Sequence, residues 1–297
     1  MDQAPGVPLL VVVDPVARLT DAESVRIARD VLRAATPELK LCLPDDPAQT
    51  PRLLARRGGR RPVLVGNDRA LLRAVQHLHG ERALEEAALS VVPVGNGPSV
   101  ALARSLGLPL DAVSAARTVL RGHPRALDLL VDDEDGIVLG GLRTERAPAP
   151  SPHREGSPSA AASPWRRMYH ALTRTVLSRA HREEQGAAPM TPAPRAPQVR
   201  TVQRLRVEAD GAVVTGPDRP VTDVTVRTAG AGLAEVSVHP LAGAPVRVRA
   251  TSVTVSAPEG FRYRADADAG AVAAPAESRT WTVLPRAWHL VLPPGEG

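Results

Sequence analysis

The sequence predicts a two-domain protein of the α/β plus all-β class, and three patterns carry this prediction. Over residues 1–142, apolar runs of strand length alternate with amphipathic helical segments, which is typical of a three-layer α/β domain with a parallel sheet. Over residues 199–297, apolar and polar residues alternate with a period of two, which is typical of an antiparallel, sandwich-like β domain. Between them, residues 143–198 are rich in Pro, Ala, Ser and Arg, and this composition predicts a linker.

The elements of the first domain follow from these patterns in chain order. Val7 to Val13 is a continuous apolar run, as in a strand buried on both faces, and the residues DPVARLT end it. Asp21 is placed to cap a helix over 22–35, whose apolar residues recur at helical spacing. The same reasoning gives a strand at 39–43, a helix at 47–57, a strand at 62–65, a helix at 71–78, a strand and a helix within 90–109, a helix at 110–120, and strands at 126–131 and 136–141.

The composition limits the classes of function. The net charge of +5 comes almost wholly from arginine, since Lys40 is the only lysine, and it suits an anionic partner such as a phosphate or a membrane surface. Aromatic residues are only 2% of the chain, too few for a stacking platform, so no nucleic-acid partner is expected. The single cysteine, Cys42, excludes an intramolecular disulfide and a cysteine-based zinc site.

The start of the chain and its apolar runs bear on localisation. The N-terminus has no basic segment before an apolar stretch, and the longest apolar runs are too short to span a bilayer. A cytoplasmic protein is therefore expected, and peripheral contact with the inner membrane face stays open. The sequence does not indicate an oligomeric state.

Two glycine turns follow buried strands of the first domain, one at 65–69 (VGNDR) and one at 94–98 (VGNGP). In an open parallel sheet, ligands bind beyond the carboxyl ends of the strands, and glycine lets backbone N–H groups approach a phosphate. Neither turn fits the Walker or GxGxxG pattern. A tight strand-to-helix turn also favours Gly and Asn, so a binding role and a purely structural role both remain open.

Taken together and in order, these turns resemble the lipid kinase catalytic domain of the diacylglycerol kinase and sphingosine kinase family, as a divergent bacterial-type member. Residues 66–70 (GNDRA) stand where the family has Gly-Gly-Asp-Gly-Thr, and residues 14–18 (DPVAR) stand where it has Asn-Pro-x-Ser-Gly. Residues 93–109 (PVGNGPSVALARSLGLP) match the family's Pro-Leu-Gly-Thr-Gly-Asn-Asp turn and the helix after it. In the second half, residues 261–268 (FRYRADAD) stand where the family has Asp-Gly-Glu, and residues 280–293 stand where it has its final strands.

The resemblance implies phosphoryl transfer from ATP to a lipid hydroxyl with Mg²⁺, in a cleft between the two halves. It implies catalytic roles for Asp68, Asp266 and Asp268, with Asp68 and Asp266 as candidate Mg²⁺ ligands. One of the two later aspartates would hold the ion or take the proton from the attacking hydroxyl. The nucleotide-binding residues that the resemblance implies are Asp14, Gly66, Asn67, Arg69, Gly95, Asn96 and Gly97.

Several motif positions depart from the family pattern. Arg69 replaces a glycine beside the phosphates, where it would either block the backbone or grip a phosphate itself. Asn67 replaces another glycine and Ala70 a threonine, while Pro98 and Ser99 replace Asn and Asp. An active lipid kinase and a non-catalytic binding or regulatory protein on the same fold both stay open. A third alternative is a soluble kinase of another small alcohol, because the first half also resembles the NAD kinases.

Two further expectations concern the linker and the tryptophans. Residues 165–184 could form a basic amphipathic helix, which either binds an anionic membrane surface or packs on its own domain. The acidic run at 132–135 is expected to be a solvated hairpin turn. Trp281 and Trp288 are expected to pack between the layers of the β domain.

Overall fold

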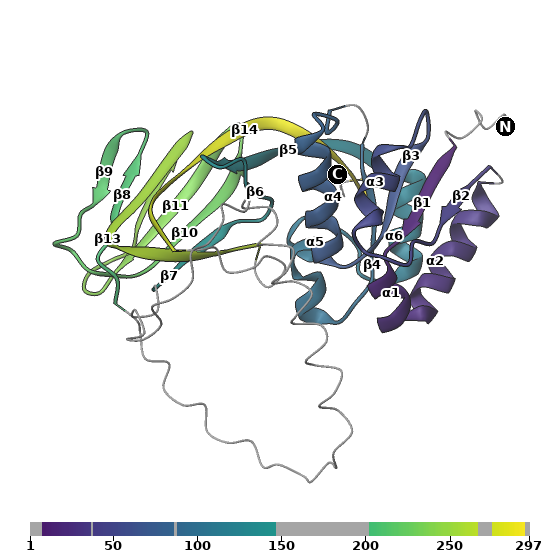
Figure 1. Cartoon of the computed structure of the whole chain (residues 1–297), viewed down its shortest axis with the longest axis horizontal. Helices are drawn as coiled ribbons and strands as arrows, with labels where there is room; N and C mark the ends of the chain where they lie inside the picture. The colour runs from purple at the N-terminus through teal and green to yellow at the C-terminus, as the bar shows by residue number, and fades with distance from the viewer. Residues whose placement is uncertain (1–7, 37, 86–87, 147–201, 267–274, 295–297) are drawn as a thin grey trace, which may run out of the picture.

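The computed structural model describes residues 8–36, 38–85, 88–146, 202–266 and 275–294. These residues form two bodies that lie side by side, one with a parallel sheet and helices and one with a large antiparallel sheet (Figure 1). The fold class predicted from the sequence is confirmed.

The parallel sheet has four strands in the order β2-β1-β3-β4, and every pairing in it is parallel. Its strands are β1 (Leu9–Val13), β2 (Lys40–Cys42), β3 (Arg61–Gly66) and β4 (Ser90–Pro93). All five residues of β1 are buried, because helices cover both faces of the sheet. The continuous apolar runs of the sequence are the direct consequence of this double coverage.

The helices make the outer two layers of the α/β domain. Alternate residues of β1 enter different cores: Val11 packs with Leu32 of the helix α2, and Val12 packs with Leu71 of the helix α4. Burial of each such side chain contributes about 1.5–3 kcal/mol. The helices are α1 (Pro15–Thr20), α2 (Ala22–Ala35), α3 (Gln49–Ala55), α4 (Asp68–Gly80), the 3₁₀ turn η1 (Gly97–Val100), α5 (Ala101–Ser105) and α6 (Ala112–Arg121).

Helix α1 corrects one expectation, because residues 15–20 were expected only to break the first strand. The side chain of Asp14 accepts a hydrogen bond from the backbone N–H of Val16 at 3.0 Å, and Pro15 occupies the first helical position. A capping side chain and an N-terminal proline together favour a helix start.

The antiparallel sheet contains ten strands, and all its pairings are antiparallel. The main path runs β12-β11-β10-β7-β13-β14-β5-β6, while β8 pairs with β13 and β9. The strands are β5 (His123–Asp132), β6 (Ile137–Val138), β7 (Leu142–Arg146), β8 (Arg206–Ala209), β9 (Ala212–Thr215), β10 (Val221–Gly230), β11 (Leu233–Pro240), β12 (Val246–Ala250), β13 (Ser252–Ala265) and β14 (Ala276–Leu292). The acidic run at 132–135 forms the turn between β5 and β6, as expected.

Strand β7 runs past residue 142, where the composition places the start of the linker. Residues 143–146 continue a strand that pairs with β10 and β13, although their composition is that of the following Pro/Ala-rich segment. The strand pairing therefore takes the chain into the antiparallel sheet from β5 onward. The division of the chain at residues 142 and 199 remains a prediction.

Strand β14 joins the two bodies (Figure 1). Its first half packs in the β-domain core, where the ring of Trp281 meets that of Tyr263 edge-on, with centroids 4.9 Å apart. Its second half lies in the core of the α/β domain, which contains Trp288 and Leu290. The backbone of Leu89, just before β4, exchanges hydrogen bonds of 2.8 and 2.9 Å with residues 289 and 291. The expectation for Trp281 is confirmed, whereas the expectation for Trp288 is wrong, because one long strand serves both cores.

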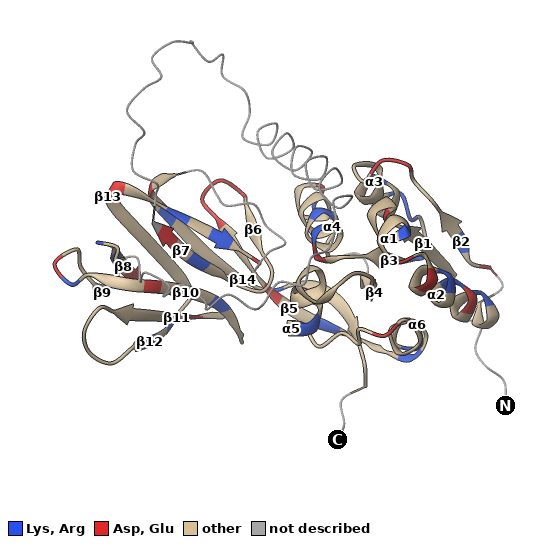
Figure 2. Ribbon diagram, turned by 90° about the horizontal axis from the view of Figure 1, so that it is seen from below, with Lys and Arg blue, Asp and Glu red and all other residues tan. Residues whose placement is uncertain are grey.

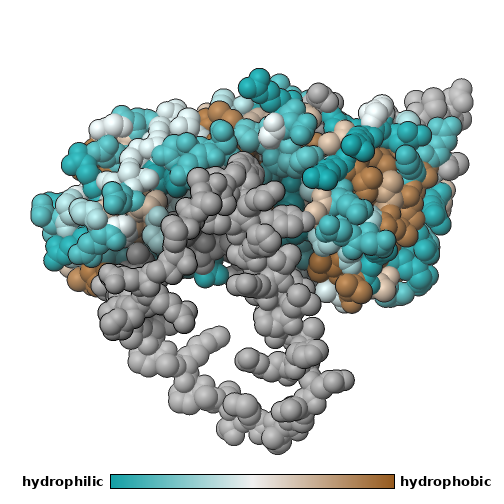
Figure 3. Space-filling model, in the orientation of Figure 1, coloured by the Kyte–Doolittle hydropathy of each residue, from teal (hydrophilic) through white to brown (hydrophobic). Residues whose placement is uncertain are grey.

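Some predictions fall outside the described residues. The basic helix expected at 165–184 and the candidate catalytic residue Asp268 both lie in segments that the structure does not describe. In the described part of the chain, every helix is too short or too polar to cross a membrane. The face seen in Figure 3 is largely hydrophilic over the β domain, and its largest apolar area lies on the α/β domain.

Candidate functional site

The structure brings the predicted turns together at the carboxyl ends of the parallel strands. The backbone N–H of Asp14, after β1, donates to the carbonyl of Val65 in β3 at 2.9 Å. The N–H of Val94, after β4, donates to the carbonyl of Gly66 at 2.9 Å. The three turns therefore share one edge of the sheet, the edge at which ligands bind in open α/β sheets.

Asp14 is fully buried at this edge. Its Oδ1 caps helix α1, and its Oδ2 accepts from the guanidinium of Arg73 at 2.8 Å and from the hydroxyl of Thr50 at 3.4 Å. Both oxygens thus have protein partners. In this arrangement Asp14 positions the first turn and helix α4, and direct nucleotide contact by Asp14 stays a prediction.

Gly66 and Asn67 have structural roles in the second turn. A Cβ atom on Gly66 would lie 2.9 Å from the Cβ of Ala70 and 3.2 Å from that of Asp14, so close packing requires glycine there. The side chain of Asn67 accepts from the backbone N–H of Ala70 at 3.1 Å and caps helix α4. Asn67, where the family has glycine, therefore starts the helix.

Arg69 lies half-buried on the first turn of α4, next to these caps. It forms no hydrogen bond or ion pair with any other residue that the structure describes. A guanidinium without a described partner has donors available, and its planar fork suits a phosphate. Both readings of Arg69, phosphate binding and blocking of the site, stay predictions.

The third turn presents open backbone. Gly95 has a φ of +149°, a conformation that favours glycine, and a Cβ atom there would collide with the side chain of Ser99. Asn96 and Gly97 are exposed, and a Cβ atom on Gly97 would meet no atom within 4 Å. The backbone at Asn96 and Gly97 is therefore open to a ligand, and nucleotide contact by this turn stays a prediction.

Asp68 is 2% exposed and is directed away from the turns, toward helix α5. Its Oδ2 accepts from the backbone N–H of Leu102 at 2.7 Å, and its Oδ1 accepts from that of Ala103 at 2.9 Å. These are N-terminal N–H groups of α5 that have no partner within the helix. Burial raises the pKa of Asp68, and the two N–H donors oppose that rise. Asp68 is a cap that joins α4 to α5.

Asp266 follows strand β13 and is also 2% exposed. Its Oδ1 accepts from the backbone N–H groups of Leu139, Gly140 and Gly141 at 2.9, 2.6 and 3.4 Å. Its Oδ2 has one longer contact, 3.2 Å from the N–H of Leu139. Burial raises the pKa of Asp266 to about 6, the N–H donors oppose the rise, and the charge of Asp68 adds to it.

Both aspartates lie near helix α5. Asp68 holds the N-terminal N–H groups of α5, while the loop that cradles Asp266 packs on Leu102 of the same helix. A Cβ atom on Gly140 would lie 2.7 Å from the Cδ1 of Leu102, so a larger residue there would require Leu102 to shift. Asp68 and Asp266 lie close enough for the charge of Asp68 to act on Asp266, while their catalytic roles stay predictions.

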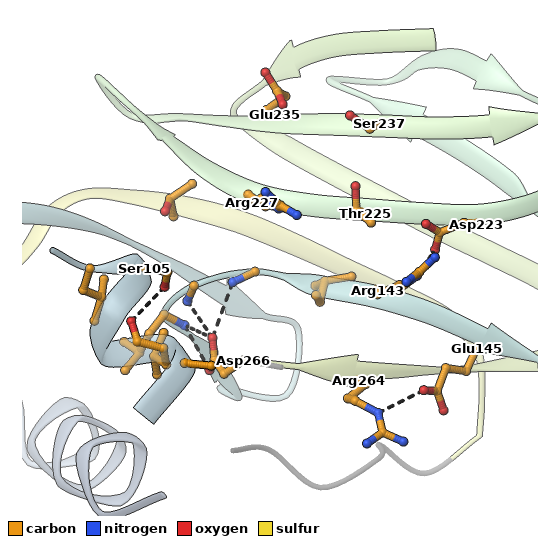
Figure 4. A pocket seen from close by; sticks show the side chains of 18 of the residues that line it. Ser105, Arg143, Glu145, Asp223, Thr225, Arg227, Glu235, Ser237, Arg264 and Asp266 are labelled. Carbon is orange, nitrogen blue, oxygen red and sulfur yellow. Dashed lines mark hydrogen bonds and ion pairs between the residues drawn. The ribbon is translucent and has the colours of Figure 1, made fainter. Parts of the chain in front are cut away.

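A pocket of about 920 Å³ lies between α5 and the antiparallel sheet, with Asp266 in its wall (Figure 4). This volume is within the range of small-molecule sites. The α/β side contributes Ala101, Leu102, Ser105 and Leu106, and the loop after β6 contributes Leu139 to Gly141. The sheet side contributes polar residues from β7, β10, β11, β12 and β13, and Figure 2 shows basic and acidic segments close together on β7 and β10.

Sequence reasoning missed the sheet side of this pocket. On β10, the lining residues Asp223, Thr225 and Arg227 follow one another at every second position, as side chains on one face of a strand do. The same alternation holds for β11, with Glu235, Ser237 and His239 lining the pocket. The period-two pattern could have shown that these residues share a face, but not that this face meets helix α5.

The described residues contain no ready-made cluster of metal-binding side chains. Mg²⁺ prefers six oxygen ligands and usually binds through one or two carboxylates. Both oxygens of Asp68 and both of Asp266 accept backbone N–H bonds, and no group of three or more His, Cys, Asp or Glu in the described residues could hold a metal ion. Mg²⁺ ligation by these aspartates therefore stays a prediction, and no chemical step below depends on it.

Comparison with known proteins gives a match at the level of the fold. No protein-family model and no curated protein matches the sequence. Among solved structures, the chain is similar to "a putative diacylglycerol kinase from Bacillus anthracis str. Sterne", with 12% identity, a TM-score of 0.68 and 99% of each chain covered. It is also similar to a structure described as one of the diacylglycerol kinases of the same strain, with 13% identity, a TM-score of 0.66, and 98% and 99% of the two chains covered. The chain therefore has the two-domain fold of these diacylglycerol kinases, which is the fold that the resemblance implied.

Proposed function

We propose that the chain transfers the γ-phosphoryl group of ATP to a hydroxyl group of a lipid alcohol bound in the pocket between its domains. The observation that carries the proposal is the placement of Asp266 in the wall of that pocket, with Oδ1 held by three backbone N–H groups and Oδ2 only lightly engaged. The similarity in fold to diacylglycerol kinases supports the reaction type.

Asp266 suits the role of general base. With a pKa of about 6, its carboxyl group is mostly ionised at neutral pH yet more basic than an exposed aspartate. The substrate hydroxyl would give its proton to Oδ2 while its oxygen bonds to the γ-phosphorus of ATP. The bond between that phosphorus and the bridging oxygen of the β-phosphate breaks, ADP leaves, and Asp266 then releases the proton to solvent.

The nucleotide would bind at the edge of the parallel sheet. Support comes from Arg69, whose guanidinium has no described partner, and from the open backbone at Asn96 and Gly97. Helix α4, 13 residues long, adds the positive end of its dipole at the same edge. These groups bind and orient phosphates, which is most of the work in phosphoryl transfer.

A second candidate, a non-catalytic binding protein on the same fold, is favoured by one observation. Asp68 keeps the position of the family's motif aspartate, yet both of its oxygens are occupied in capping α5. If the motif aspartate is only a structural cap, nucleotide binding could persist without transfer.

The test is transfer of label from γ-³²P-ATP, in buffer with Mg²⁺, to a panel of neutral and anionic lipid alcohols in mixed micelles, with calorimetry of ATP binding in parallel. We expect labelled lipid with the natural chain and at least a hundredfold less with Asp266→Asn. ATP binding without transfer to any lipid would favour the second candidate. The absence of both would contradict both functions.

A further inference from the structure

A row of polar side chains crosses the antiparallel sheet on the face that lines the pocket. Strand register places Arg264 of β13 opposite Arg143 of β7, Arg143 opposite Thr225 of β10, Thr225 opposite Ser237 of β11, and Ser237 opposite Arg247 of β12. Directly opposed residues of antiparallel strands share a face, and all five line the pocket. Figure 4 labels four of them: Arg143, Thr225, Ser237 and Arg264. At about 4.8 Å per strand, the row spans about 19 Å.

The centre of the row has two hydroxyl groups available to a ligand. Neither Thr225 nor Ser237 hydrogen-bonds through its side chain to another residue in the described ranges, although Ser237 is only 8% exposed. Such a hydroxyl group can both donate and accept a hydrogen bond. The cost of burying it is offset only when a partner is present.

The arginines around these hydroxyls divide into two kinds. Arg143 is held by Asp223, whose Oδ1 lies 2.7 Å from its Nε, and this contact leaves both terminal nitrogens of Arg143 unused by described residues. Arg227 and Arg247 are exposed, line the pocket, and pair with no described residue. The stem of Arg227 packs over Gly141, which belongs to the cradle of Asp266.

The positive and negative side chains that line the pocket are equal in number, and this balance limits the charge that a ligand can carry. Four arginines (Arg143, Arg227, Arg247 and Arg264) face four carboxylates (Glu145, Asp223, Glu235 and Asp266). Carboxylates accept hydrogen bonds from the hydroxyl groups of a polyol, and guanidinium groups pair with phosphate. A single phosphate on a hydroxyl-rich group matches this mixture better than the several charges of a triphosphate, which the carboxylates would repel.

The apolar part of the lining belongs to one side of the pocket. The leucines at 102, 139 and 142 line the pocket but are only 2–3% exposed, while Ala101 and Leu106 of the α5 region are half-buried. The headgroup of diacylglycerol is neutral and would leave Arg227 and Arg247, which pair with no described residue, without an anionic partner. A phosphorylated ligand therefore matches these two arginines better than a neutral one does.

We propose that the row from Arg264 to Arg247, together with Arg227, binds a phosphorylated polyol group, and that this group is the headgroup of the acceptor whose free hydroxyl reaches Asp266. The assignment of an acceptor rests on the proposed function, whereas the binding of the phosphorylated polyol does not. Asp266 lies two residues beyond Arg264, at most about 7 Å along the chain, so a bound polyol could contact both. The headgroup can belong to a soluble molecule or to a lipid.

The experiment measures binding to the full chain by calorimetry, with glycerol 3-phosphate, inositol 1-phosphate and their neutral parents as probes. Vesicles of phosphatidylcholine with and without phosphatidylinositol distinguish a lipid source from a soluble one. The variants are Arg227→Gln, Arg247→Gln and the double variant Thr225→Val/Ser237→Ala. Arg219→Gln is the matched control, since Arg219 is an exposed arginine of the same domain that does not line the pocket. Thermal unfolding checks that each variant folds.

The expected result is that the phosphorylated probes bind and their neutral parents bind at least tenfold more weakly. Each arginine variant should weaken the phosphorylated probes by about tenfold, the value of one lost charge-assisted hydrogen bond, and Arg219→Gln should not. Equal binding of phosphorylated and neutral probes, or equal losses in Arg219→Gln, would overturn the inference. So would competitive displacement of the probe by ATP, which would make the row the nucleotide site.

The experiments distinguish a failure of this inference from a failure of the proposed function. Label transfer to a short-chain diacylglycerol that is unchanged in Arg227→Gln would overturn the inference and leave the proposed function standing. Arginine-dependent binding of the phosphorylated probes without any label transfer would uphold the binding site and contradict the proposed function.

Discussion

Asp68 and Asp266 are two carboxylates of one chemical type in one region of the molecule, and they differ in what they face. Both are 2% exposed, and both accept hydrogen bonds from backbone N–H groups. Asp68 divides its bonds evenly between its oxygens, at 2.7 and 2.9 Å, and caps a helix. Asp266 concentrates its bonds on one oxygen and lines the pocket with the other less engaged. The comparison teaches that a sequence motif predicts where an aspartate lies. The hydrogen bonds that each of its oxygens accepts indicate what the aspartate does.

The two aspartates should differ most in their effect on catalysis. Asp266→Asn keeps an oxygen at Oδ1 for the backbone N–H groups but removes the base at Oδ2. We expect turnover to fall by about 10²–10⁴-fold, the usual contribution of a general base, with ATP affinity unchanged. Initial rates of label transfer and calorimetry measure the two quantities. Full activity of Asp266→Asn would remove Asp266 from the mechanism.

The next largest effect is the contribution of Asp266 to the pH dependence of the free energy of unfolding. Because the folded pKa of Asp266 is about 6 and its ordinary value is 3.8, the folded state retains a proton that the unfolded state has lost. The stability of the natural chain should therefore fall, relative to Asp266→Asn, as pH rises from about 4 to about 6, by about 3 kcal/mol in total. Urea unfolding of both proteins across this range measures the difference. A constant difference would show that burial does not shift this group.

Asp68 should matter more for folding than a surface cap does. Asp68→Ala leaves the buried N–H groups of Leu102 and Ala103 without an acceptor, which should lower the free energy of unfolding by about 2–3 kcal/mol. Asp111→Ala is the matched control, because Asp111 caps helix α6 at an exposed position through the N–H of Ser114. It should cost about 1 kcal/mol. Equal losses in the two variants would contradict the description of Asp68 as a buried cap.

The smallest effect should be on nucleotide affinity. Arg69→Gln removes a guanidinium that has no partner among the described residues at the edge of the parallel sheet, and we expect ATP to bind about tenfold more weakly, which corresponds to about 1.4 kcal/mol. Arg33→Gln, an exposed change on helix α2, is the control and should leave ATP binding unchanged. Tighter ATP binding by Arg69→Gln would support the alternative that Arg69 blocks the phosphates.

Local patterns predicted most of the α/β domain. The helix expected at 22–35 has those bounds in the structure, because Asp21 caps it through the N–H of Ser24 and its apolar stripe packs on the sheet. Glycines directly after apolar runs marked the turns, and the rule that parallel strands end at one edge predicted that the turns lie together. The sequence does not fix the role of these turns, since packing explains Gly66 and helix capping explains Asn67.

The pocket could not be predicted from local patterns, for two physical reasons. The cradle of Asp266 consists of backbone N–H groups at 139–141, which leave no signature in side-chain type beyond two glycines. The polar row depends on the register of five strands, one of which, β7, lies far from the other four in sequence, and alternation alone does not fix register. Trp288 was misplaced for a related reason, because one strand crosses from one core to the other.

The most direct test of the account is the pH profile of kcat/KM for label transfer from ATP, measured with the natural chain and with Asp266→Asn. Since this parameter reports the ionisation of the free enzyme, the natural chain should gain activity with rising pH around a midpoint near 6, the pKa of Asp266. The Asp266→Asn profile should be flat in this range and at least a hundredfold lower. The same midpoint and a similar rate in Asp266→Asn would contradict the claim that Asp266 takes the proton of the acceptor hydroxyl.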